Sequence, residues 1–324
     1  MQLTRLGPLE GVSRLTLGGG GLGRVWGETS IDEAIATVHA AIEGGITLID
    51  TAPMYRDCEQ VIGRAFNGRL PAGVRITTKH QLGAPPPGET AARLEASLAA
   101  SLAAMGIERA DVFFLHSNIR PDAYVYPRDA ERQDRFATPW SLYAAEVAPA
   151  MESLARQGRI GAWGITGVGV PETIIQALAH DPAPGVVQAV TNLLDSPGGM
   201  RRYDEAPRPR EIIAAANTRG IGVMGIRAVQ AGALTAAFDR DLRAEHPEAA
   251  DFRRAAPFRA LCRAIGADPA VIAHRYALSM AGVDTVILGV KNRAELDDCL
   301  AAEAAGPLDP AIIAQIDQLG LRAD

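Results

Sequence analysis

Four polar residues, Asp50, Tyr55, Lys79 and His116, stand at the ends of predicted strands or in the loop that follows one of them. Tyr55 lies in the loop after Asp50, and the other three each close a short apolar run. These runs span residues 46–49, 74–78 and 111–115. The carboxyl ends of neighbouring parallel strands meet at one face of an α/β protein, so we expect the four side chains to converge there.

These residue types suit the reduction of a carbonyl group. Tyrosine is a poor acid at neutral pH because its free pKa is about 10, and the ammonium of Lys79 would stabilise the phenolate and lower that pKa. Asp50 would hold the lysine charged and in place, and His116 would hydrogen-bond a substrate oxygen. Together they would protonate a carbonyl oxygen while a hydride arrives at the carbon. Each residue alone is more often structural, so the interpretation depends on their joint placement.

Composition narrows the class of protein. The chain has 324 residues, 48% hydrophobic and 22% charged, which is ordinary for a soluble protein with ample core. The net charge of −6 disfavours nucleic-acid binding, and three cysteines without a CxxC pair indicate neither a disulfide framework nor a zinc site. No signal peptide is apparent, and no window approaches the ~20 apolar residues of a membrane span. We therefore expect a cytoplasmic protein with no membrane contact.

Short apolar runs alternate with amphipathic helices along the chain. The first helix begins at Ser30, where Ser30 and Glu33 form a capping box, and stops at Gly44. Eight strands are predicted, near residues 15–17, 46–50, 74–79, 111–116, 160–166, 186–191, 222–226 and 285–288. Eight alternating units predict an α/β protein with a closed (β/α)8 TIM barrel, residues 1–324 forming one domain. We also expect an N-terminal β-hairpin at the barrel's bottom and long loops at its mouth, residues 117–139 and 227–249.

Several segments resemble aldo-keto reductases. Residues 50–55, which read D-T-A-P-M-Y, are similar to that family's D-T-A-x-x-Y signature, and Lys79 and His116 stand in matching lysine and histidine segments. Residues 187–194 resemble its strand-six signature, and residues 289–293 resemble the stretch that grips the adenosine end of NADPH. The resemblance covers nearly the whole chain. It implies a (β/α)8 barrel, a nicotinamide cofactor bound without a Rossmann fold, and tyrosine as the general acid.

The resemblance also implies a set of cofactor-binding residues: Gln188, which would hold the nicotinamide amide, with Thr166, Arg227, Gly289, Lys291, Asn292 and Arg293. The chain departs from the family pattern at Thr166-Gly167 (usually Ser-Asn), Thr191 (often aromatic), Arg227-Ala228-Val229 (usually Ser-Pro-Leu) and Asp298-Cys299 (usually Glu-Asn). Arg227 fits either a pyrophosphate contact or a surface salt bridge.

Cofactor preference depends on the start of the last barrel helix. Asn292 could cap that helix with Glu295 completing the box, and Lys291 and Arg293 flank the cap. Two cations near a helix N-terminus suit a phosphate. The 2′-phosphate of NADPH is the natural candidate, so NADP(H) is favoured over NAD(H).

Other interpretations stay open. Residues 18–23 satisfy GxGxxG, but the next helix cap comes only at Ser30, so we expect a loop at the barrel mouth and no Rossmann fingerprint. The six histidines contain no HxH or HExxH pattern, so no metal is expected. A cofactor-sensing regulatory subunit with little turnover, or an NAD-dependent sugar or alcohol dehydrogenase, are the alternatives to an NADP(H)-dependent reductase.

The substrate is a small carbonyl compound or alcohol in this interpretation. Trp26, His80 and Trp140 are candidate pocket residues, although a packing role fits Trp26 and Trp140 equally well. Aldehydes, ketones and sugars all remain open, and so do the direction of the reaction and the oligomeric state.

Overall fold

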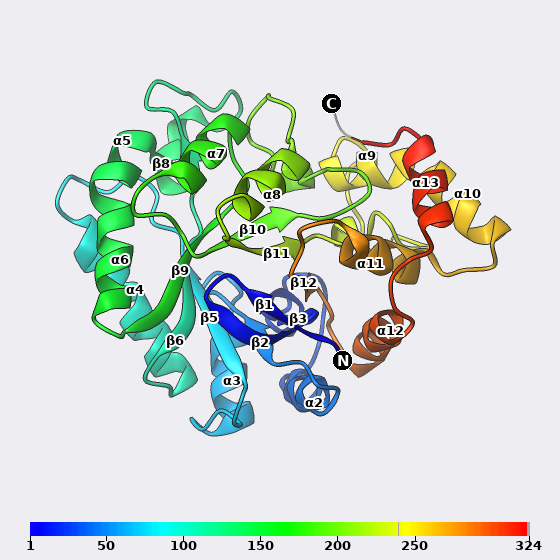
Figure 1. Ribbon diagram of the computed structural model, residues 1–324, viewed down its shortest axis with the longest axis horizontal. Helices are drawn as coiled ribbons and strands as arrows, with labels where there is room; N and C mark the ends of the chain where they lie inside the picture. The colour runs from blue at the N-terminus through cyan, green and yellow to red at the C-terminus, as the bar shows by residue number, and fades with distance from the viewer. Residues whose placement is uncertain (239, 323–324) are drawn as a thin grey trace.

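Eight parallel strands form a closed barrel in the computed structural model, which describes residues 1–238 and 240–322 (Figure 1). Residues 239, 323 and 324 of the predicted domain, the first of them in the predicted loop 227–249, lie outside the described residues. In spatial order the strands are β10 (Val186–Val190), β11 (Gly222–Ile226), β12 (Thr285–Leu288), β3 (Leu15–Gly18), β4 (Leu48–Asp50), β5 (Arg75–His80), β6 (Ala110–Leu115) and β9 (Ile160–Thr166). The predicted (β/α)8 barrel is confirmed.

Helices pack around this barrel (Figure 1). The ring contains α2 (Ile31–Glu43), α3 (Cys58–Phe66), α4 (Thr90–Met105), α6 (Ala148–Arg156), α7 (Pro171–Ala179), α8 (Pro209–Asn217), α11 (Pro269–Ser279) and α12 (Arg293–Ala304). The Ser30 hydroxyl caps α2 by accepting the Glu33 amide at 3.0 Å, as predicted. The carboxylate of Glu33 does not complete the capping box. It binds Arg293 instead.

An N-terminal hairpin lies against the barrel, as predicted. Its strands, β1 (Leu3–Leu6) and β2 (Leu9–Ser13), pair antiparallel and appear in blue at the centre of Figure 1. Leu6 and Val12 share a buried cluster with Leu48 and Phe114 of the barrel strands. Gly7 turns the hairpin with φ 53°, and a Cβ there would lie 2.2 Å from the Gly185 carbonyl oxygen. Only glycine fits this close approach.

The glycine run after β3 differs from its prediction. A one-turn helix, α1 (Gly19–Leu22), begins directly after the strand, where we expected a loop. A Cβ on Gly21 would lie 1.9 Å from the Val290 carbonyl oxygen, so the run lets two backbone segments meet at the barrel mouth. The Rossmann interpretation still fails, because the strands close into a barrel and do not form an open sheet.

The two long loops carry structure of their own. The first contains a small parallel sheet, β7 (Asn118–Arg120) with β8 (Ala137–Pro139), and the 3₁₀ turn η1 (Ala130–Arg135). A short helix, α5 (Trp140–Leu142), and a π-helical turn, η2 (Tyr143–Val147), then lead into α6. The second contains the 3₁₀ turn η4 (Gln230–Gly232) before α9 (Pro247–Arg254) and α10 (Ala256–Ala264). Two further short elements are η3 (Gly198–Met200) and α13 (Pro310–Gln318). Among the described residues, no helix has the length and apolar character needed to cross a membrane.

A matched pair of leucine substitutions tests the packing of the helical layer. Leu98 of α4 is fully buried in the largest core cluster, whereas Leu3 is 57% exposed. Leu98→Ala should lower the free energy of unfolding by about 3 kcal/mol because it leaves a cavity. Leu3→Ala should change it by less than about 0.5 kcal/mol. Denaturant unfolding measures both, and equal effects would contradict this assignment of the core.

Candidate active site

A buried ion pair joins β4 and β5 at the barrel mouth. Lys79 Nζ lies 2.6 Å from Asp50 Oδ2 and donates to the Thr51 carbonyl oxygen at 2.9 Å. Both side chains are almost fully removed from solvent. Burial is the largest single influence on the pKa of Lys79 and lowers it, but Asp50 and Tyr55 together outweigh burial, and the pKa is raised overall. The lysine is therefore a fixed, charged ammonium.

The other oxygen of Asp50 is also occupied. Asp50 Oδ1 accepts hydrogen bonds from Thr77 Oγ1 at 2.6 Å and from Gln188 Nε2 at 2.7 Å. Gln188 comes from β10, so the contact crosses the barrel. We expected the Gln188 amide to hold a nicotinamide amide. One N–H of this amide donates to Asp50, which leaves the amide oxygen and the second N–H available to a ligand.

Tyr55 sits above this pair. Its ring centroid is 4.7 Å from Lys79 Nζ, and the side chain is half-buried. Burial raises the pKa of Tyr55, and the Lys79 ammonium opposes this without outweighing it. The sequence led us to expect a lowered pKa. Lys79 lowers the pKa of Tyr55 as expected, but desolvation raises it by more. The free tyrosine therefore stays protonated at neutral pH.

His116 packs edge-on against Tyr55, with ring centroids 6.0 Å apart and planes at 89°. Burial lowers the pKa of His116 to about 3, and the nearby charge of Lys79 acts in the same direction. Its Nδ1 atom is buried without a hydrogen-bond partner. A neutral imidazole beside the tyrosine suits a hydrogen bond to a substrate oxygen.

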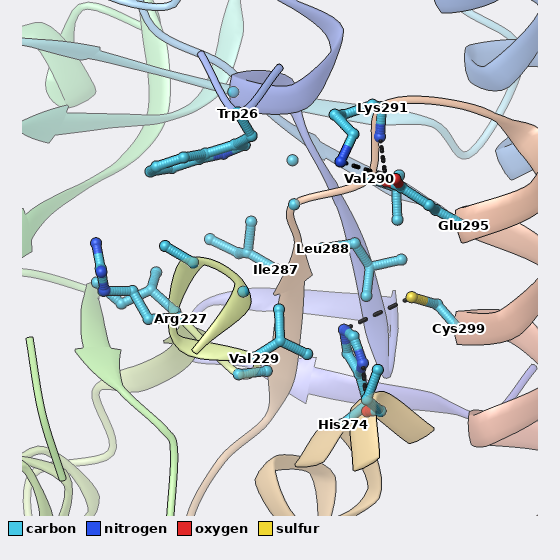
Figure 2. Close-up of a pocket in the computed structure, with 18 of the residues that line it drawn as sticks. Trp26, Arg227, Val229, His274, Ile287, Leu288, Val290, Lys291, Glu295 and Cys299 are labelled. Atoms are coloured by element: carbon cyan, nitrogen blue, oxygen red, sulfur yellow. Dashed lines mark hydrogen bonds and ion pairs between the residues drawn. The ribbon is translucent and has the colours of Figure 1, made fainter. Parts of the chain in front are cut away.

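A cavity of about 410 Å³ opens from this cluster. Asp50, Tyr55 and His116 line it together with residues from the last part of the chain, on β12, α11 and α12. Figure 2 shows Trp26 across the cavity from Arg227 and Val229, with Lys291, Glu295 and Cys299 along another wall. The volume of this cavity falls within the range of small-molecule binding sites.

The expected cofactor-binding residues divide into two groups. Thr166, Gln188, Arg227, Gly289 and Lys291 line the cavity. The other two, Asn292 and Arg293, are outside the set of lining residues. The Asn292 side chain accepts the Glu295 amide at 3.0 Å and caps α12, as predicted.

Thr166 offers an unused polar group to a ligand. Its side chain is 7% exposed, its hydroxyl is buried without a partner, and it lines the cavity. Thr166 lies beside Gln188 in the register of β9 and β10. Buried polar groups are normally hydrogen-bonded. The Thr166 hydroxyl and the Gln188 amide oxygen therefore fit a ligand with an amide group, such as a nicotinamide ring.

Arg227 forms a buried ion pair with Glu248, so it is neither part of a surface salt bridge nor a free cation. Its Nη2 lies 2.6 Å from Glu248 Oε1, and its Nε donates to Gln230 Oε1 at 2.7 Å. Burial lowers the pKa of Arg227, against the opposing effect of Glu248. The pair ties the loop after β11 to α9. Sequence reasoning missed Glu248, because nothing in its local pattern indicates that α9 packs against the η4 turn after β11.

The three predicted pocket residues separate in the structure. Trp26 lines the cavity, whereas His80 and Trp140 do not. Trp140 packs against Tyr143 and His180, with ring centroids 5.6 Å away in both cases. The Trp140 side chain therefore belongs to the packing of the helical layer. His80 supports the site indirectly, since its carbonyl oxygen accepts the His116 amide at 2.8 Å.

His274 and Cys299 also line the cavity, although no sequence motif assigned either residue to the site. His274 Nε2 lies 3.6 Å from Cys299 Sγ, and His274 Nδ1 lies 2.9 Å from the Ala270 carbonyl oxygen (Figure 2). Burial raises the pKa of Cys299 to about 12. Cys299 was visible only as a departure from the family pattern. In the described part of the chain, no group of three or more His, Cys, Asp or Glu side chains could hold a metal ion.

The closed parallel barrel and its mouth cavity define a (β/α)8 protein with a ligand site at the carboxyl ends of the strands. Sequence comparison gives the family. The model of the Aldo/keto reductase family matches residues 14–320, so the chain belongs to this family of oxidoreductases.

Named relatives include two sugar dehydrogenases. The chain is 24% identical over 296 residues to L-galactose dehydrogenase of Arabidopsis thaliana, covering 90% of this chain and 84% of that protein. It is 25% identical over 316 residues to D-threo-aldose 1-dehydrogenase of a Pseudomonas species, covering 88% and 87%. An aldo/keto reductase from Klebsiella pneumoniae, solved with NADP and acetate, superimposes with a TM-score of 0.68 at 20% identity, covering 99% and 95%. At that identity the structural match supports the fold alone.

The buried, neutral state of His116 predicts a pH effect on stability. As the pH falls below the ordinary value of 6.5, an unfolded His116 gains a proton, while the folded one resists protonation until about pH 3. Wild type should therefore lose stability relative to His116→Gln in that window, by roughly 2 kcal/mol near pH 5 compared with pH 8. Denaturant unfolding at both pH values measures this. A stability difference that does not change with pH would contradict it.

Proposed function

We propose that this protein reversibly transfers hydride between a nicotinamide cofactor and the carbonyl carbon of a small aldehyde, ketone or sugar. The observation that carries the proposal is Tyr55, which faces the cavity above the buried Lys79–Asp50 pair. The cofactor supplies or accepts the hydride. The chain's own residues supply the proton and hold the reacting groups.

Each residue has a role that its environment supports. Tyr55 gives its hydroxyl proton to the carbonyl oxygen in reduction and takes it back in oxidation. Lys79 stabilises the phenolate formed at that moment, and Asp50 holds Lys79 in place. Neutral His116 donates a hydrogen bond that orients the substrate oxygen. Thr166 and Gln188 would hold the nicotinamide amide with the polar groups left to them.

Sugars and small aldehydes are the substrate class that the relatives support. L-galactose dehydrogenase and D-threo-aldose 1-dehydrogenase act on sugars by name. Methylglyoxal reductase YeaE of Escherichia coli, 30% identical over 179 residues, acts on a small aldehyde by name. We infer that this chain takes a substrate of that size, in a single domain of residues 1–324 working in the cytoplasm.

The cofactor has two candidates. NADP(H) is the sequence prediction from Lys291 and Arg293, and the Klebsiella neighbour was solved with NADP. An NAD-dependent sugar dehydrogenase is the second candidate function. A specific observation favours it, because Lys291 and Arg293 both hold carboxylates of the chain itself.

The proposal is tested by absorbance of the reduced nicotinamide. Aldehydes and ketones are offered with NADPH and NADH, and sugars are offered with NADP and NAD. We expect turnover with at least one pair. Tight dinucleotide binding without turnover over the whole panel would favour the alternative of a regulatory subunit.

A tyrosine pair isolates the chemistry. Tyr55→Phe should lower kcat by roughly 10²–10⁴-fold because it removes the proton donor, while the cofactor Kd stays nearly unchanged. Tyr143→Phe is the control for loss of a tyrosine hydroxyl, since Tyr143 is fully buried and packs against Trp140 outside the cavity. Steady-state kinetics and calorimetric titration give both quantities. Unchanged turnover in Tyr55→Phe would refute the assigned role.

Thr166 tests how the cofactor is held. Thr166→Val keeps the shape of the side chain but removes the hydroxyl, so the Kd for the oxidised dinucleotide should rise about fivefold, the worth of one neutral hydrogen bond. Thr166→Ser should restore most of the affinity. Calorimetric titration measures both variants. Equal Kd values for wild type and Thr166→Val would remove Thr166 from the binding site.

A further inference from the structure

Arg293 is bound to a carboxylate from a distant helix. Its Nε and Nη2 atoms donate to Glu33 at 3.2 and 2.9 Å, and its backbone amide donates to Glu33 Oε1 at 3.0 Å. Glu33 lies in the first turn of α2, and Arg293 is the first residue of α12. The Glu33 carboxylate therefore occupies one backbone amide and the guanidinium at the start of α12.

Lys291 is engaged in the same way. Its Nζ lies 2.8 Å from Glu295 Oε1, and its backbone amide donates to Glu295 Oε2 at 2.8 Å. Lys291 and Glu295 both line the cavity (Figure 2). The segment before α2 also passes here, since a Cβ on Gly27 would lie 3.0 Å from Lys291 Cδ. Glu295 and Glu33 thus accept the backbone amides of Lys291 and Arg293, which are two residues apart.

A phosphate bound at the start of α12 would need the same backbone amides and side-chain cations of Lys291 and Arg293. Amides at a helix start and adjacent cations form an anion site. Here two carboxylates fill it, so a 2′-phosphate would have to displace them and then lie beside their negative charges. A ribose 2′-hydroxyl brings no such charge, and it can donate a hydrogen bond to Glu295, which is 37% exposed and lines the cavity.

We propose that Glu33 and Glu295 are specificity-determining residues that disfavour a 2′-phosphate, so that this protein binds NAD(H) at least as tightly as NADP(H). The proposal rests on the proposed function only in requiring a nicotinamide dinucleotide in the cavity. Two acidic residues would then set the choice of cofactor, and not Lys291 and Arg293, the basic residues that they pair with.

Direct binding tests this without catalysis. The Kd values of NADH and NADPH are measured by calorimetric titration on wild type, Glu33→Gln and Glu295→Gln. We expect wild type to bind NADH at least as tightly as NADPH. Each variant should shift the ratio of the two Kd values toward NADPH by about fivefold, the worth of freeing one partly exposed cation.

Two further variants control the result. Asp32→Asn removes an exposed carboxylate from the same turn of α2 and should leave the ratio unchanged. Arg293→Ala should cancel the shift when combined with Glu33→Gln, because the freed guanidinium is then absent. Circular dichroism and thermal unfolding verify that each variant is folded.

The outcomes separate the two proposals. If neither dinucleotide binds, the proposed function falls and this inference falls with it. If both bind but wild type binds NADPH more tightly than NADH, or if either glutamine variant keeps the wild-type ratio, this inference alone is overturned.

Discussion

The buried ion pair between Lys79 and Asp50 is the constraint on which the rest of the site depends. Removing two charges from water costs several kcal/mol per ion unless geometry and further hydrogen bonds compensate. Asp50 of β4 meets this condition with contacts to Lys79 and Thr77 of β5 and to Gln188 of β10. The barrel must therefore close with β10 facing β4 before the pair is satisfied, which makes the geometry of the site a consequence of the fold.

The protonation states around the pair follow from the same burial. Desolvation raises the pKa of Tyr55 and lowers the pKa of His116, while Asp50 and Tyr55 together hold the pKa of Lys79 above its ordinary value. The cluster thus offers a neutral acid, a neutral hydrogen-bond donor and a fixed cation in one small volume. A phenolate would appear only as the proton leaves, when Lys79 is already in position to stabilise it.

Carboxylates also bind the basic residues in and beside the cavity. Arg227, Lys291 and Arg293 each hold an acidic partner, which is Glu248, Glu295 or Glu33. A basic residue near a ligand site is not by itself an anion receptor when the fold supplies its counter-ion. These basic residues therefore act as members of ion pairs, and the acidic members come from helices α2, α9 and α12.

The eight strands, the barrel that they form and the placement of Asp50, Tyr55, Lys79 and His116 at or after strand ends could be predicted from the sequence, because apolar runs and strand-end residues are local patterns. The helix caps at Ser30 and Asn292 could be predicted for the same reason. The partners of these residues became known from the folded chain. The crossing of Gln188 to Asp50, the placement of Trp140 in the helical layer and the capture of Arg293 by Glu33 join residues far apart in the chain. No local pattern carries such contacts, since they depend on how the barrel closes and how its helices pack.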